Sequence, residues 1–573
     1  MNQPRPEHPN PQFVRKHWQN LNGEWEFEVD KSVVGFEAGY PARESFRQVI
    51  TVPFCPESKL SGIGQTEFLN CVWYAKSFTV PKEHAQKRVL LTFGAVDYHA
   101  FLYINGEFAG EHRGGYTPFR TDITDLLKPG ENRIVLAAKD DCRLGTQPAG
   151  KQSAKLHSHG CFYTRTTGIW QTVWLEFIDP AHIVKFRTQT DAVTGDVSIT
   201  VHASPEALGR TLDVAAYWDG KEVGRAQTTI QSLSHPISFR VSELHLWDIG
   251  AGNLYDVTLT ISNNGVVSDQ VESYFGIRSV CLSKKSQMLN GRAFFGRYVL
   301  DQGFYPDGIY TAPTDEALKQ DILLSQALGF NGARLHEKIF EPRFLYWADK
   351  LGYLVWGEHA NWGLKISDFS NLANFLPEWI EGVERDYNHP SIIGWCPFNE
   401  TWDDNPGKKR QDDRVLQIVY QATKAVDPSR PVIDTSGNYH VVTDIYDVHD
   451  YTQDGAKFAG HYTGEVFYEH LADRQQWRGE PYFVSEYGGI RWAADSQEGW
   501  GYGDAPKTEE EFIERFRSLT LTLLQNPNIC ALCYTQLYDV EQEVNGLYTY
   551  ARKPKFDPGV IRKILTTPAA IEQ

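Results

Sequence analysis

The sequence predicts a multidomain protein in which two all-β domains precede a C-terminal (β/α)8 barrel, the TIM-barrel fold. Three observations support this interpretation. At 573 residues the chain is too long for a single hydrophobic core. Up to about residue 277, short alternating strands lie between turn signals and no convincing helix occurs. After about residue 278, apolar strands alternate with helices over roughly 290 residues, which is the size of a TIM barrel.

Residues 1–179 are interpreted as a jelly-roll domain. The segment 1–20 is rich in Pro and Asn and is expected to lie extended on the surface. The segments 89–93, 100–104, 133–137 and 172–176 alternate as strands do, and Asn105-Gly106 supplies a tight turn. The segment 140–167 breaks this rhythm, because it is long and rich in Gly, Ser and His. Loops of this length in compact domains tend to be functional or mobile.

Residues 180–277 are interpreted as an immunoglobulin-like β-sandwich. The segments 197–201, 212–218 and 255–261 alternate, and Asp219-Gly220 supplies a turn. This region contains no cluster of reactive residues, so we expect its role to be structural.

Residues 278–573 are interpreted as the catalytic barrel. The predicted strands are 293–301, 330–336, 353–358, 391–398, 431–435, 444–449, 482–486 and 530–536. The predicted helices are 315–328, 341–350, 374–387, 411–425 and 509–525. For the first helix, Thr314 is a plausible N-cap and Gly329 a plausible end.

Nearly every predicted barrel strand ends in a polar residue. In chain order these residues are Asp301, His336, Glu358, Glu400, Asp434, His449, Glu486 and Gln536. The C-terminal ends of barrel strands meet at one mouth, where barrel enzymes keep their active sites. The chain has no phosphate-binding glycine loop, nucleotide fingerprint or strained nucleophile elbow. We therefore expect an active site at this mouth whose chemistry depends on carboxylate side chains.

Glu400 and Glu486 follow the fourth and seventh strands, which lie roughly across a barrel mouth. Cleavage of a glycosidic bond needs two such carboxylates, one protonated and one ionised. A separation of about 5–5.5 Å would give retention of configuration, and about 6.5–9.5 Å would give inversion. The bland alternative is two unrelated structural glutamates.

The amino-acid composition limits the kinds of partner that the protein is expected to bind. The formal net charge of −17 argues against nucleic acid or an anionic membrane as a partner. The 16 Trp, 28 Tyr and 31 Phe suit either sugar-binding pockets or β-rich cores. The first residues lack a signal-peptide apolar run and no run of about 18 apolar residues occurs, so we expect a cytoplasmic protein.

No metal site is assigned from the sequence. The eight Cys are scattered and are interpreted as reduced thiols. Cys530 and Cys533 lie on a predicted strand, where positions i and i+3 face opposite sides, so core filling is preferred to metal binding. His157 and His159 offer ligand atoms, but two loop histidines more often have no such role.

Five motifs, together with the domain order, resemble glycoside hydrolase family 2 over essentially the whole chain. They are Asn399-Glu400, Ser485-Glu486-Tyr487-Gly488-Gly489, Gly168-Ile169-Trp170, Asn331-Gly332-Ala333-Arg334 and Arg552-Lys553-Pro554-Lys555. That family includes β-galactosidases, β-glucuronidases and β-mannosidases. Many barrel glycosidases share the Asn-Glu pair, but the whole set is specific.

The resemblance implies that Glu400 is the acid/base and Glu486 the nucleophile of a retaining mechanism. It also implies that Asn399 binds the sugar 2-hydroxyl, that Arg334 keeps the nucleophile ionised and that Tyr451 hydrogen-bonds it. The further candidates for substrate binding are Asp301, His336, Glu358, His449 and Gln536. The 140–167 loop of the first domain would reach the mouth. No cofactor is expected to be required, since Glu358-His359 has the ligand types but not the spacing of a known Mg²⁺ site in large β-galactosidases.

Departures from the family pattern bear on the sugar. Glucuronidases of the family carry Asn-x-Lys-Gly after the eighth strand, where this chain has Glu543-Val544-Asn545-Gly546. An extra carboxylate and no lysine argue against a uronic acid. The usual Ser-His-Tyr-Pro is replaced by His336-Glu337-Lys338-Ile339, so the pocket is expected to differ from the best-known members.

The sequence thus predicts an exo-acting retaining glycosidase that removes a neutral terminal sugar. The first candidate substrate is a β-galactoside. A β-galactofuranoside, α-L-arabinoside or β-mannoside are alternatives, and a β-glucuronide is a less favoured one. A non-catalytic carbohydrate-binding protein is the remote alternative. The expected partner is a glycoside substrate, and the expected assembly is a homo-oligomer.

Overall fold

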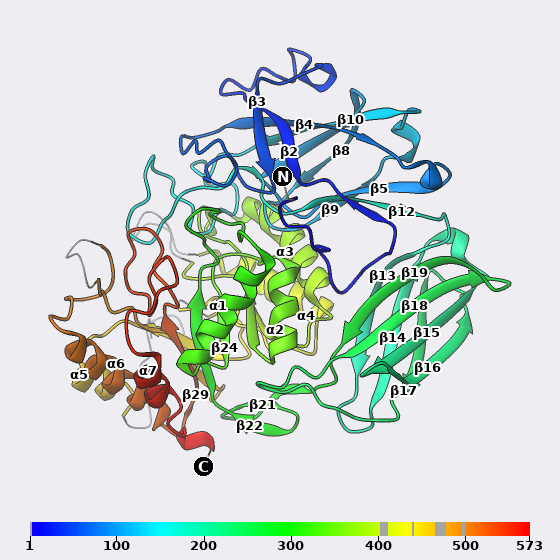
Figure 1. The fold of residues 1–573 in the computed structure, drawn as a ribbon. Helices are drawn as coiled ribbons and strands as arrows, with labels where there is room; N and C mark the ends of the chain where they lie inside the picture. Colours follow the sequence, from blue (N-terminus) through cyan, green and yellow to red (C-terminus); the bar gives the residue numbers. More distant parts are fainter. Residues whose placement is uncertain (1–2, 402–410, 438–439, 464–476, 494–498, 573) are drawn as a thin grey trace.

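The structure is a computed structural model of the 573-residue chain that describes residues 3–401, 411–437, 440–463, 477–493 and 499–572. Figure 1 shows one β-sandwich at the top, a second at the right, and a helix-bearing barrel between them and the lower left. Among the described residues, no helix combines the length and apolar character needed to cross a membrane. The loop predicted directly after Glu400 falls mostly on residues 402–410, which lie outside the described residues.

The first β-sandwich consists mainly of two antiparallel sheets, which confirms the predicted jelly-roll class. Their orders are β3-β2-β4-β10-β7-β8 and β1-β12-β5-β9, with β11-β6 as a two-stranded addition. The strands are β1 (Trp18–Asn20), β2 (Gly23–Val29), β3 (Gln48–Val52), β4 (Cys71–Thr79), β5 (Arg88–Phe93), β6 (Val96–Asp97), β7 (His99–Ile104), β8 (Glu107–Arg113), β9 (Phe119–Asp122), β10 (Glu131–Lys139), β11 (Gly168–Ile169) and β12 (Val173–Ile178). Trp25 and Leu136 of one sheet and Leu91 and Phe177 of the other share one core, which holds the sheets together.

The second β-sandwich has the sheet orders β13-β14-β17 and β16-β15-β18-β19. Its strands are β13 (Ile183–Thr190), β14 (Asp196–Ala203), β15 (Thr211–Trp218), β16 (Lys221–Thr229), β17 (Ser234–Arg240), β18 (Tyr255–Asn263) and β19 (Val266–Phe275). Alternate residues such as Val197, Ile199, Val214 and Leu259 are buried in one core between the sheets. The apolar–polar alternation predicted at 197–201, 212–218 and 255–261 therefore corresponds to strands.

The N-terminal segment is more buried than the sequence predicts. Arg15 is buried and pairs with Asp269 at 2.9 Å and with Glu176 at 3.0 Å, so it ties the two sandwiches together. Arg5 is also buried and reaches Glu341 of the barrel at 2.7 Å. A segment rich in Pro and Asn looked like a surface tail, but its two arginines find carboxylates on three parts of the chain. Each buried charge requires such a partner.

The barrel is built on a parallel sheet of order β26-β25-β24-β23-β29-β28-β27. Its strands are β23 (Gly296–Asp301), β24 (Gly332–Leu335), β25 (Leu354–Glu358), β26 (Ile392–Cys396), β27 (Tyr446–Asp450), β28 (Tyr482–Gly488) and β29 (Ile529–Thr535). A small sheet of β20 (Val280–Leu282), β21 (Gln287–Leu289) and β22 (Arg292–Phe294) precedes it.

Helices follow the barrel strands as the sequence predicts. They are α1 (Asp315–Leu328), α2 (Pro342–Leu351), α3 (Leu372–Asp386), α4 (Asp413–Val426) and α6 (Glu509–Leu524), with α5 (Gly455–His461) and α7 (Pro558–Leu565) as unpredicted additions. At the start of α1, the Thr314 side chain accepts a hydrogen bond from the Ala317 backbone N–H at 3.2 Å. Gly329 ends α1 with a φ of 99°, a conformation that favours glycine.

The predicted fifth strand, 431–435, is not a regular strand. It meets β26 through the isolated bridge Trp395–Val432, and the residues that follow the two segments meet through the bridge Asn399–Ser436. The reason is a competing set of side-chain hydrogen bonds, in which the Asp434 carboxylate accepts from the backbone N–H of Val441 at 2.6 Å and of Val442 at 3.0 Å. These bonds turn the chain where a strand ladder would have continued.

Side chains then complete the barrel wall between this segment and β27. The Ser436 hydroxyl donates to the Asp447 carboxylate at 2.7 Å, and the Gly437 backbone N–H donates to the same carboxylate at 3.2 Å. The wall next to Glu400 is therefore held by polar side chains, which keeps hydroxyl and imidazole groups close to the mouth.

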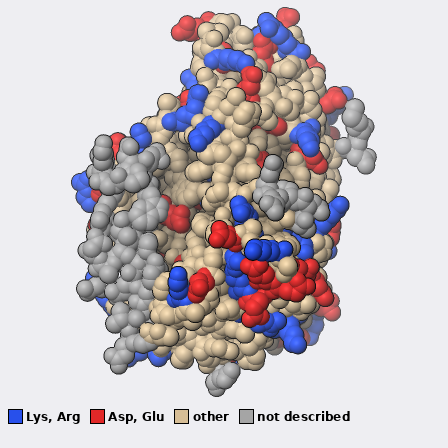
Figure 2. All heavy atoms as spheres, turned by 90° about the vertical axis from the view of Figure 1, so that its left-hand side faces the viewer, with Lys and Arg blue, Asp and Glu red and all other residues tan. Residues whose placement is uncertain are grey.

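Figure 2 shows the left-hand side of the molecule in Figure 1. On this face, outside the grey residues, Lys and Arg lie among Asp and Glu and form no continuous basic surface. This agrees with the acidic net charge of −17.

Candidate active site

Glu486 lies on β28 with its carboxylate held from both sides. Arg334 of β24 donates to Glu486 Oε1 at 3.2 Å, and the Tyr451 hydroxyl donates to Oε2. Glu486 is 4% exposed and Arg334 is 1% exposed, so their attraction acts in a region from which water is largely excluded. A guanidinium and a hydroxyl donor therefore hold this carboxylate in one position.

Arg334 connects several groups at the mouth of the barrel through hydrogen bonds. Its Nε donates to Glu358 at 2.5 Å, its Nη1 to the Ser485 carbonyl at 2.7 Å, and its Nη2 to the Asn399 side-chain oxygen at 3.2 Å. Because all three nitrogens of the guanidinium are engaged, Arg334 fixes the positions of β25, β26 and β28 relative to one another. The Asn399 side-chain oxygen faces Arg334, and its amide nitrogen donates to no residue that the structure describes.

Glu400 follows β26 in a left-handed backbone conformation, with a φ of 42°. Its backbone N–H donates to the Ser436 carbonyl at 2.9 Å, which holds this unfavourable conformation in place. The Glu400 side chain is 21% exposed, compared with 5% for that of Glu486. Glu400 is thus the carboxylate with more access to the outside of the mouth.

The two carboxylates lie close together. One oxygen of Glu400, one oxygen of Glu486 and one ring nitrogen of His449 are all within 4.8 Å of one another. One oxygen of each acid is thus close enough for both acids to contact the same sugar residue.

His449, at the end of β27, lies between the carboxylates. Its Nδ1 is 2.6 Å from Glu400 Oε1 and 3.4 Å from Glu486 Oε2, and its Nε2 is 2.9 Å from the Ser436 hydroxyl. Gly437 packs under the ring, where a Cβ atom would lie 2.3 Å from it. The imidazole is therefore held in one orientation by contacts on three sides.

Charge in this cluster favours a proton on His449. Burial by itself would raise the pKa of Glu400, but the hydrogen bond and charge of His449, together with Lys151 and Arg334, lower it below its usual value. Burial by itself would lower the pKa of His449, but Glu486 and Glu400 outweigh it and raise that pKa. Both shifts favour a proton on the imidazole beside an ionised Glu400.

Two predicted residues, Glu358 and His336, are buried next to the groups that surround Glu486. Glu358 accepts a hydrogen bond from Arg334 and lies 3.2 Å from Nδ1 of His336. The His336 Nδ1 is 3.9 Å from Glu486. Burial and neighbouring Lys151 lower the pKa of His336 well below its usual value, so it is neutral beside the nucleophile candidate.

Two further predicted residues do not join the carboxylate pair. The Asp301 carboxylate accepts from the Gly303 backbone N–H at 2.9 Å and from the Tyr538 hydroxyl at 2.5 Å. Gln536 is fully buried and donates to Asn545 at 2.8 Å. Asp301 acts as an anchor for the loops after β23 and β29, and Gln536 orders the groups beneath Glu543.

The structure adds Lys151 to the mouth, a residue that the sequence did not single out. Lys151 belongs to the 140–167 loop, and its ammonium lies 3.8 Å from the centre of the Trp362 ring. It donates no hydrogen bond to any residue that the structure describes. Burial disfavours its charge, but Glu543, Glu337 and Glu486 are among the groups that outweigh burial and raise its pKa. The only advance signal was the unusual length of its loop.

Glu337 and Glu543 are buried carboxylates near Lys151. Glu337 accepts from the Trp362 backbone N–H at 3.0 Å, while its other oxygen has no partner among the described residues. Glu543 accepts from the Tyr163 hydroxyl and from Asn545 at 2.9 Å. Burial raises the pKa of both acids.

The 140–167 loop is fastened over one side of the barrel. The backbone N–H groups of Ala149 and Gly150 donate to the Trp362 carbonyl at 2.8 and 2.9 Å. On the other side, Gln542 donates to the carbonyl of Gly160 at 2.8 Å. The loop thus reaches the mouth, as expected, and gives it a wall from another domain.

Aromatic rings form much of the remaining wall. Tyr502 stacks on Tyr451 with 3.4 Å between ring centres and 6° between planes. Trp362 donates from its indole to the Asn399 carbonyl at 3.1 Å and carries Lys151 on its face. Tyr502 and Trp362 gave no signal in the sequence, because aromatic residues are frequent throughout the chain.

The same site contains the one cluster of three potential metal-binding groups found among the described residues, Glu400, His449 and Glu486. These atoms already contact each other at 2.6 and 3.4 Å, and the cluster includes the predicted acid and nucleophile, so we assign no metal to it. Cys530 and Cys533 are buried free thiols in the apolar core of the barrel, as predicted.

Comparison with known proteins relates all three parts of the chain to one family. Residues 64–175 match the profile "Glycosyl hydrolases family 2, sugar binding domain". Residues 181–278 match "Glycosyl hydrolases family 2", and residues 311–517 match "Glycosyl hydrolases family 2, TIM barrel domain".

Curated relatives have two kinds of name. A β-glucuronidase of Canis lupus familiaris is 28% identical over 466 residues, which cover 74% of this chain and 69% of that protein. A β-galactosidase of Thermoanaerobacterium thermosulfurigenes is 26% identical over 496 residues, which cover 82% of this chain and 64% of that protein. The chain therefore spans about two thirds of the length of these relatives.

Solved structures share the architecture. A β-glucuronidase of an uncultured Clostridium sp. superposes with a TM-score of 0.81 at 21% identity, covering 96% of this chain and 98% of that one. A Ruminococcus gnavus β-glucuronidase in complex with D-glucuronic acid gives a TM-score of 0.80 at 18% identity, with coverages of 96% and 98%. At these identities the likeness shows the fold, and the substrate has to be argued from the side chains in the mouth.

Proposed function

Because the chain belongs to glycosyl hydrolases family 2, we propose that it is an exo-acting glycoside hydrolase that releases a terminal neutral sugar with retention of configuration. The observation that carries the proposal is the carboxylate pair, Glu400 and Glu486, with oxygens within 4.8 Å of one another. Retaining glycosidases hold this pair about 5–5.5 Å apart, whereas inverting enzymes need about 6.5–9.5 Å. A β-galactoside is the first candidate substrate.

In the first step, Glu486 attacks the anomeric carbon while the bond from that carbon to the leaving oxygen breaks. Arg334 and Tyr451 hold Glu486 ionised before the attack. The leaving oxygen takes its proton from Glu400, and the sugar stays covalently attached to Glu486. In the second step, Glu400 removes a proton from water, the water attacks the same carbon, the bond to Glu486 breaks, and the proton returns from Glu400 to His449. No cofactor enters this chemistry.

His449 supplies the proton that Glu400 delivers. In the free enzyme the imidazolium lies 2.6 Å from Glu400, within hydrogen-bond reach. When a leaving oxygen approaches, the proton passes from Nδ1 to Glu400 and on to that oxygen. The neutral imidazole then faces Glu486, whose negative charge has been consumed in the covalent bond. In this scheme the general acid is the pair His449–Glu400.

The side chains around Lys151 favour a neutral sugar. Glu337 and Glu543 are two buried carboxylates on the same side of the mouth as this ammonium. Sugar hydroxyls can donate to such carboxylates and accept from the ammonium at the same time. A uronate would add a negative charge to this cluster. The carboxylates already there would repel that charge, or they would have to take up protons to accommodate it.

The 140–167 loop supports exo action. It contacts the segments after β25 and after β29 through Ala149, Gly150 and Gly160, so the mouth is closed along that side. A closed side suits a pocket that accepts the end of a glycan chain, and it obstructs an open groove in which a long chain could lie.

A β-glucuronide is the second candidate, and one observation favours it. Lys151 carries a charge, lies in the mouth and hydrogen-bonds no described residue, so it could pair with a sugar carboxylate. The names of several relatives point the same way. Lys151 therefore weakens the sequence-based argument against a uronic acid, which rested partly on the absence of a lysine next to Glu543.

A panel of nitrophenyl glycosides separates the two. We expect the highest kcat/KM on the β-galactoside or another neutral glycoside, and at least about 100-fold less on the glucuronide, as expected when one buried charged contact is mismatched. A glucuronide hydrolysed faster than every neutral sugar would overturn the neutral-sugar proposal. Tight sugar binding with no hydrolysis of any member would favour the non-catalytic alternative.

A further inference from the structure

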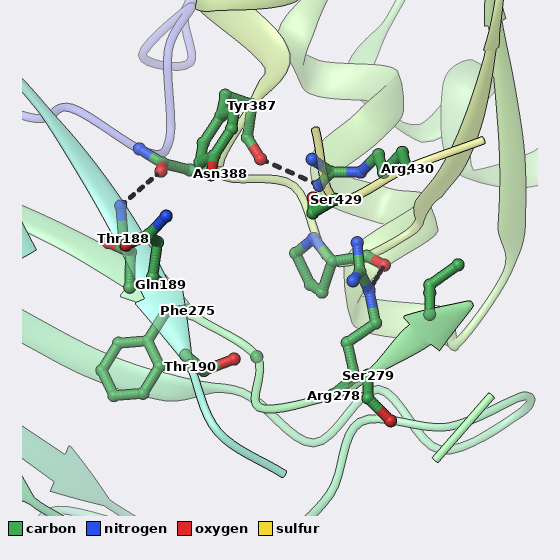
Figure 3. A pocket seen from close by; sticks show the side chains of 13 residues that line it. Thr188, Gln189, Thr190, Phe275, Arg278, Ser279, Tyr387, Asn388, Ser429 and Arg430 are labelled. Atoms are coloured by element: carbon green, nitrogen blue, oxygen red, sulfur yellow. Dashed lines mark hydrogen bonds between the residues drawn. The ribbon is translucent and has the colours of Figure 1, made fainter. Parts of the chain in front are cut away.

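A second site is suggested by a cavity at the junction of the second β-sandwich and the barrel. Its volume is about 290 Å³. Figure 3 shows Thr188, Gln189 and Thr190 of β13 on one side of this cavity and Arg278 and Arg430 on the other. The barrel residues there precede β26 or follow α4, so the cavity lies where β26 begins, whereas Glu400 follows its end.

The charge of the cavity is opposite to that of the protein. Its lining residues include two arginines and no aspartate or glutamate, in a chain with a formal net charge of −17. Two guanidiniums facing the same small space repel one another, and a pocket lined in this way gains stability from a negatively charged occupant.

The two arginines differ in their partners. Arg430 is satisfied, because it pairs with Asp427 at 2.7 Å and donates to the carbonyls of Tyr387 and His389 at 2.8 and 2.9 Å. Among the residues that the structure describes, Arg278 donates only to main-chain carbonyls, that of Pro390 at 2.6 Å and that of Ile392 at 2.8 Å.

Arg278 is thus a cation without a carboxylate partner among the described residues. Its Nη1 group donates to none of them. Burial and the nearby charge of Arg430 lower the pKa of Arg278 to about 9, although the more distant charges of Asp427 and Asp349 act in the opposite direction. An arginine is normally protonated far above this pH, so the surroundings of Arg278 disfavour its charge unless an anion is added.

The opposite wall offers neutral donors. The side chains of Thr188, Gln189 and Thr190 make no hydrogen bond to a described residue, although the backbone N–H of Thr188 donates to Asn388 at 2.8 Å. A wall that contains these three neutral polar residues therefore lies opposite the two arginines. This combination matches the acceptor-rich surface of an oxyanion, which arginine binds in a two-pronged geometry.

We propose that this cavity binds a small molecule through an oxyanion group, a phosphate or a carboxylate, held between Arg278 and β13. The bound group would join the second sandwich to the barrel, since each wall belongs to a different part of the chain. The site is separate from the carboxylate pair of the mouth, and the proposal does not depend on which sugar the enzyme cleaves.

Calorimetric titration of the full chain with inorganic phosphate and with citrate, in chloride buffer of matched ionic strength, tests the proposal. We expect one saturable site for at least one of these probes. Phosphate binding alone would identify the group as a phosphate, and citrate binding alone as a carboxylate. Absence of saturable binding of both probes would overturn the proposal.

Variants localise the binding. Arg278→Gln should weaken it tenfold or more, but this change also removes hydrogen bonds to two carbonyls and can reduce stability. Gln189→Leu leaves those bonds intact and should weaken binding severalfold. Arg225→Gln, on the exposed face of the same sandwich, is the matched control and should bind as the wild type does. All three should keep the wild-type kcat/KM, which reports correct folding. Binding unchanged in both Arg278→Gln and Gln189→Leu would place the ligand elsewhere and refute the site.

Discussion

Replacing His449 by Gln tests the proposed proton supply most directly. Glutamine keeps a polar group that can contact Ser436 and Glu400, but it cannot carry the proton. The change removes the imidazole that lies 2.6 Å from Glu400 and 3.4 Å from Glu486. The acid/base carboxylate then has to bind the catalytic proton by itself.

The size of the effect follows from the group that holds the proton. The ordinary pKa values of an imidazole and of a glutamate carboxyl, about 6.5 and about 4.3, differ by about 2 units. Losing the hydrogen bond and charge of His449, which lower the pKa of Glu400 in the wild type, offsets part of this difference, so the pKa that governs the proton falls by roughly 1–2 units. In the wild type the proton is retained on His449, whose pKa lies above its ordinary value of 6.5. In the variant it is retained only by a carboxyl group, which loses it at lower pH. The basic limb, which is the fall in kcat/KM as the pH is raised, should therefore move toward lower pH.

Two assays measure this. The first is the pH dependence of kcat/KM, where we expect the basic limb of the variant to lie roughly 1–2 units below that of the wild type. The charged and titratable groups that interact with the imidazole are Glu400, Glu486, Asp447, Glu358, Arg334 and His336, and all of them remain in the variant. The second compares leaving groups. An alkyl glycoside, which needs the acid, should lose about 100-fold in kcat/KM, while a dinitrophenyl glycoside should lose little.

His336→Gln is the control, because His336 contacts Glu358 and not Glu400. It should lower activity without moving the basic limb. The reasoning is refuted if the basic limb of His449→Gln stays at the wild-type pH, or if both leaving groups lose activity equally. Either result would reduce His449 to a residue that only shapes the mouth.

Other expectations follow from the same contacts. Glu486→Ala should nearly abolish hydrolysis, and azide should partly restore turnover with the inverted glycosyl azide as product; an azide product of retained configuration would show that the roles of Glu400 and Glu486 are exchanged. Lys151→Met should raise KM for the preferred neutral glycoside about tenfold or more, since a charge-assisted hydrogen bond to the sugar is lost, and a substrate profile identical to the wild type would remove Lys151 from the mouth's chemistry. His440→Asn tests the polar wall near β27: burial would lower the pKa of His440, but Asp434 and Asp447 raise it to about 10. A raised pKa stabilises the fold fully below the unfolded value of 6.5 and loses that effect as pH rises toward 10, so the melting-temperature gap between wild type and variant should narrow over that range, and a gap that widens would contradict the assignment.

The sequence by itself determined the order of the parts and the identity of the acids. Period-two alternation along 197–201 and the capping residues of α1 act within a few residues, so their effect can be followed along the chain. The same holds for the strand ends that carry Glu400 and Glu486, because an apolar run that stops at an acid is a local pattern. The motifs around these residues then made the resemblance to the family specific.

The predicted fifth strand shows where local reasoning ended. Residues 431–435 have the composition of a strand, yet Asp434 captures the backbone N–H groups of Val441 and Val442 and turns the chain. Which of two competing sets of hydrogen bonds forms depends on the neighbours that the barrel supplies. Composition alone does not contain that information.

Only the tertiary structure decided what surrounds the carboxylates. Lys151 reaches the mouth from the first domain, and His449 comes to lie between Glu400 and Glu486 because Gly437 and Ser436 leave room for its ring and bind it. The separation of the two acids is likewise a property of the closed barrel. These contacts join residues far apart in the chain, and their energies depend on burial and on the charges around them, which no spacing along the sequence records.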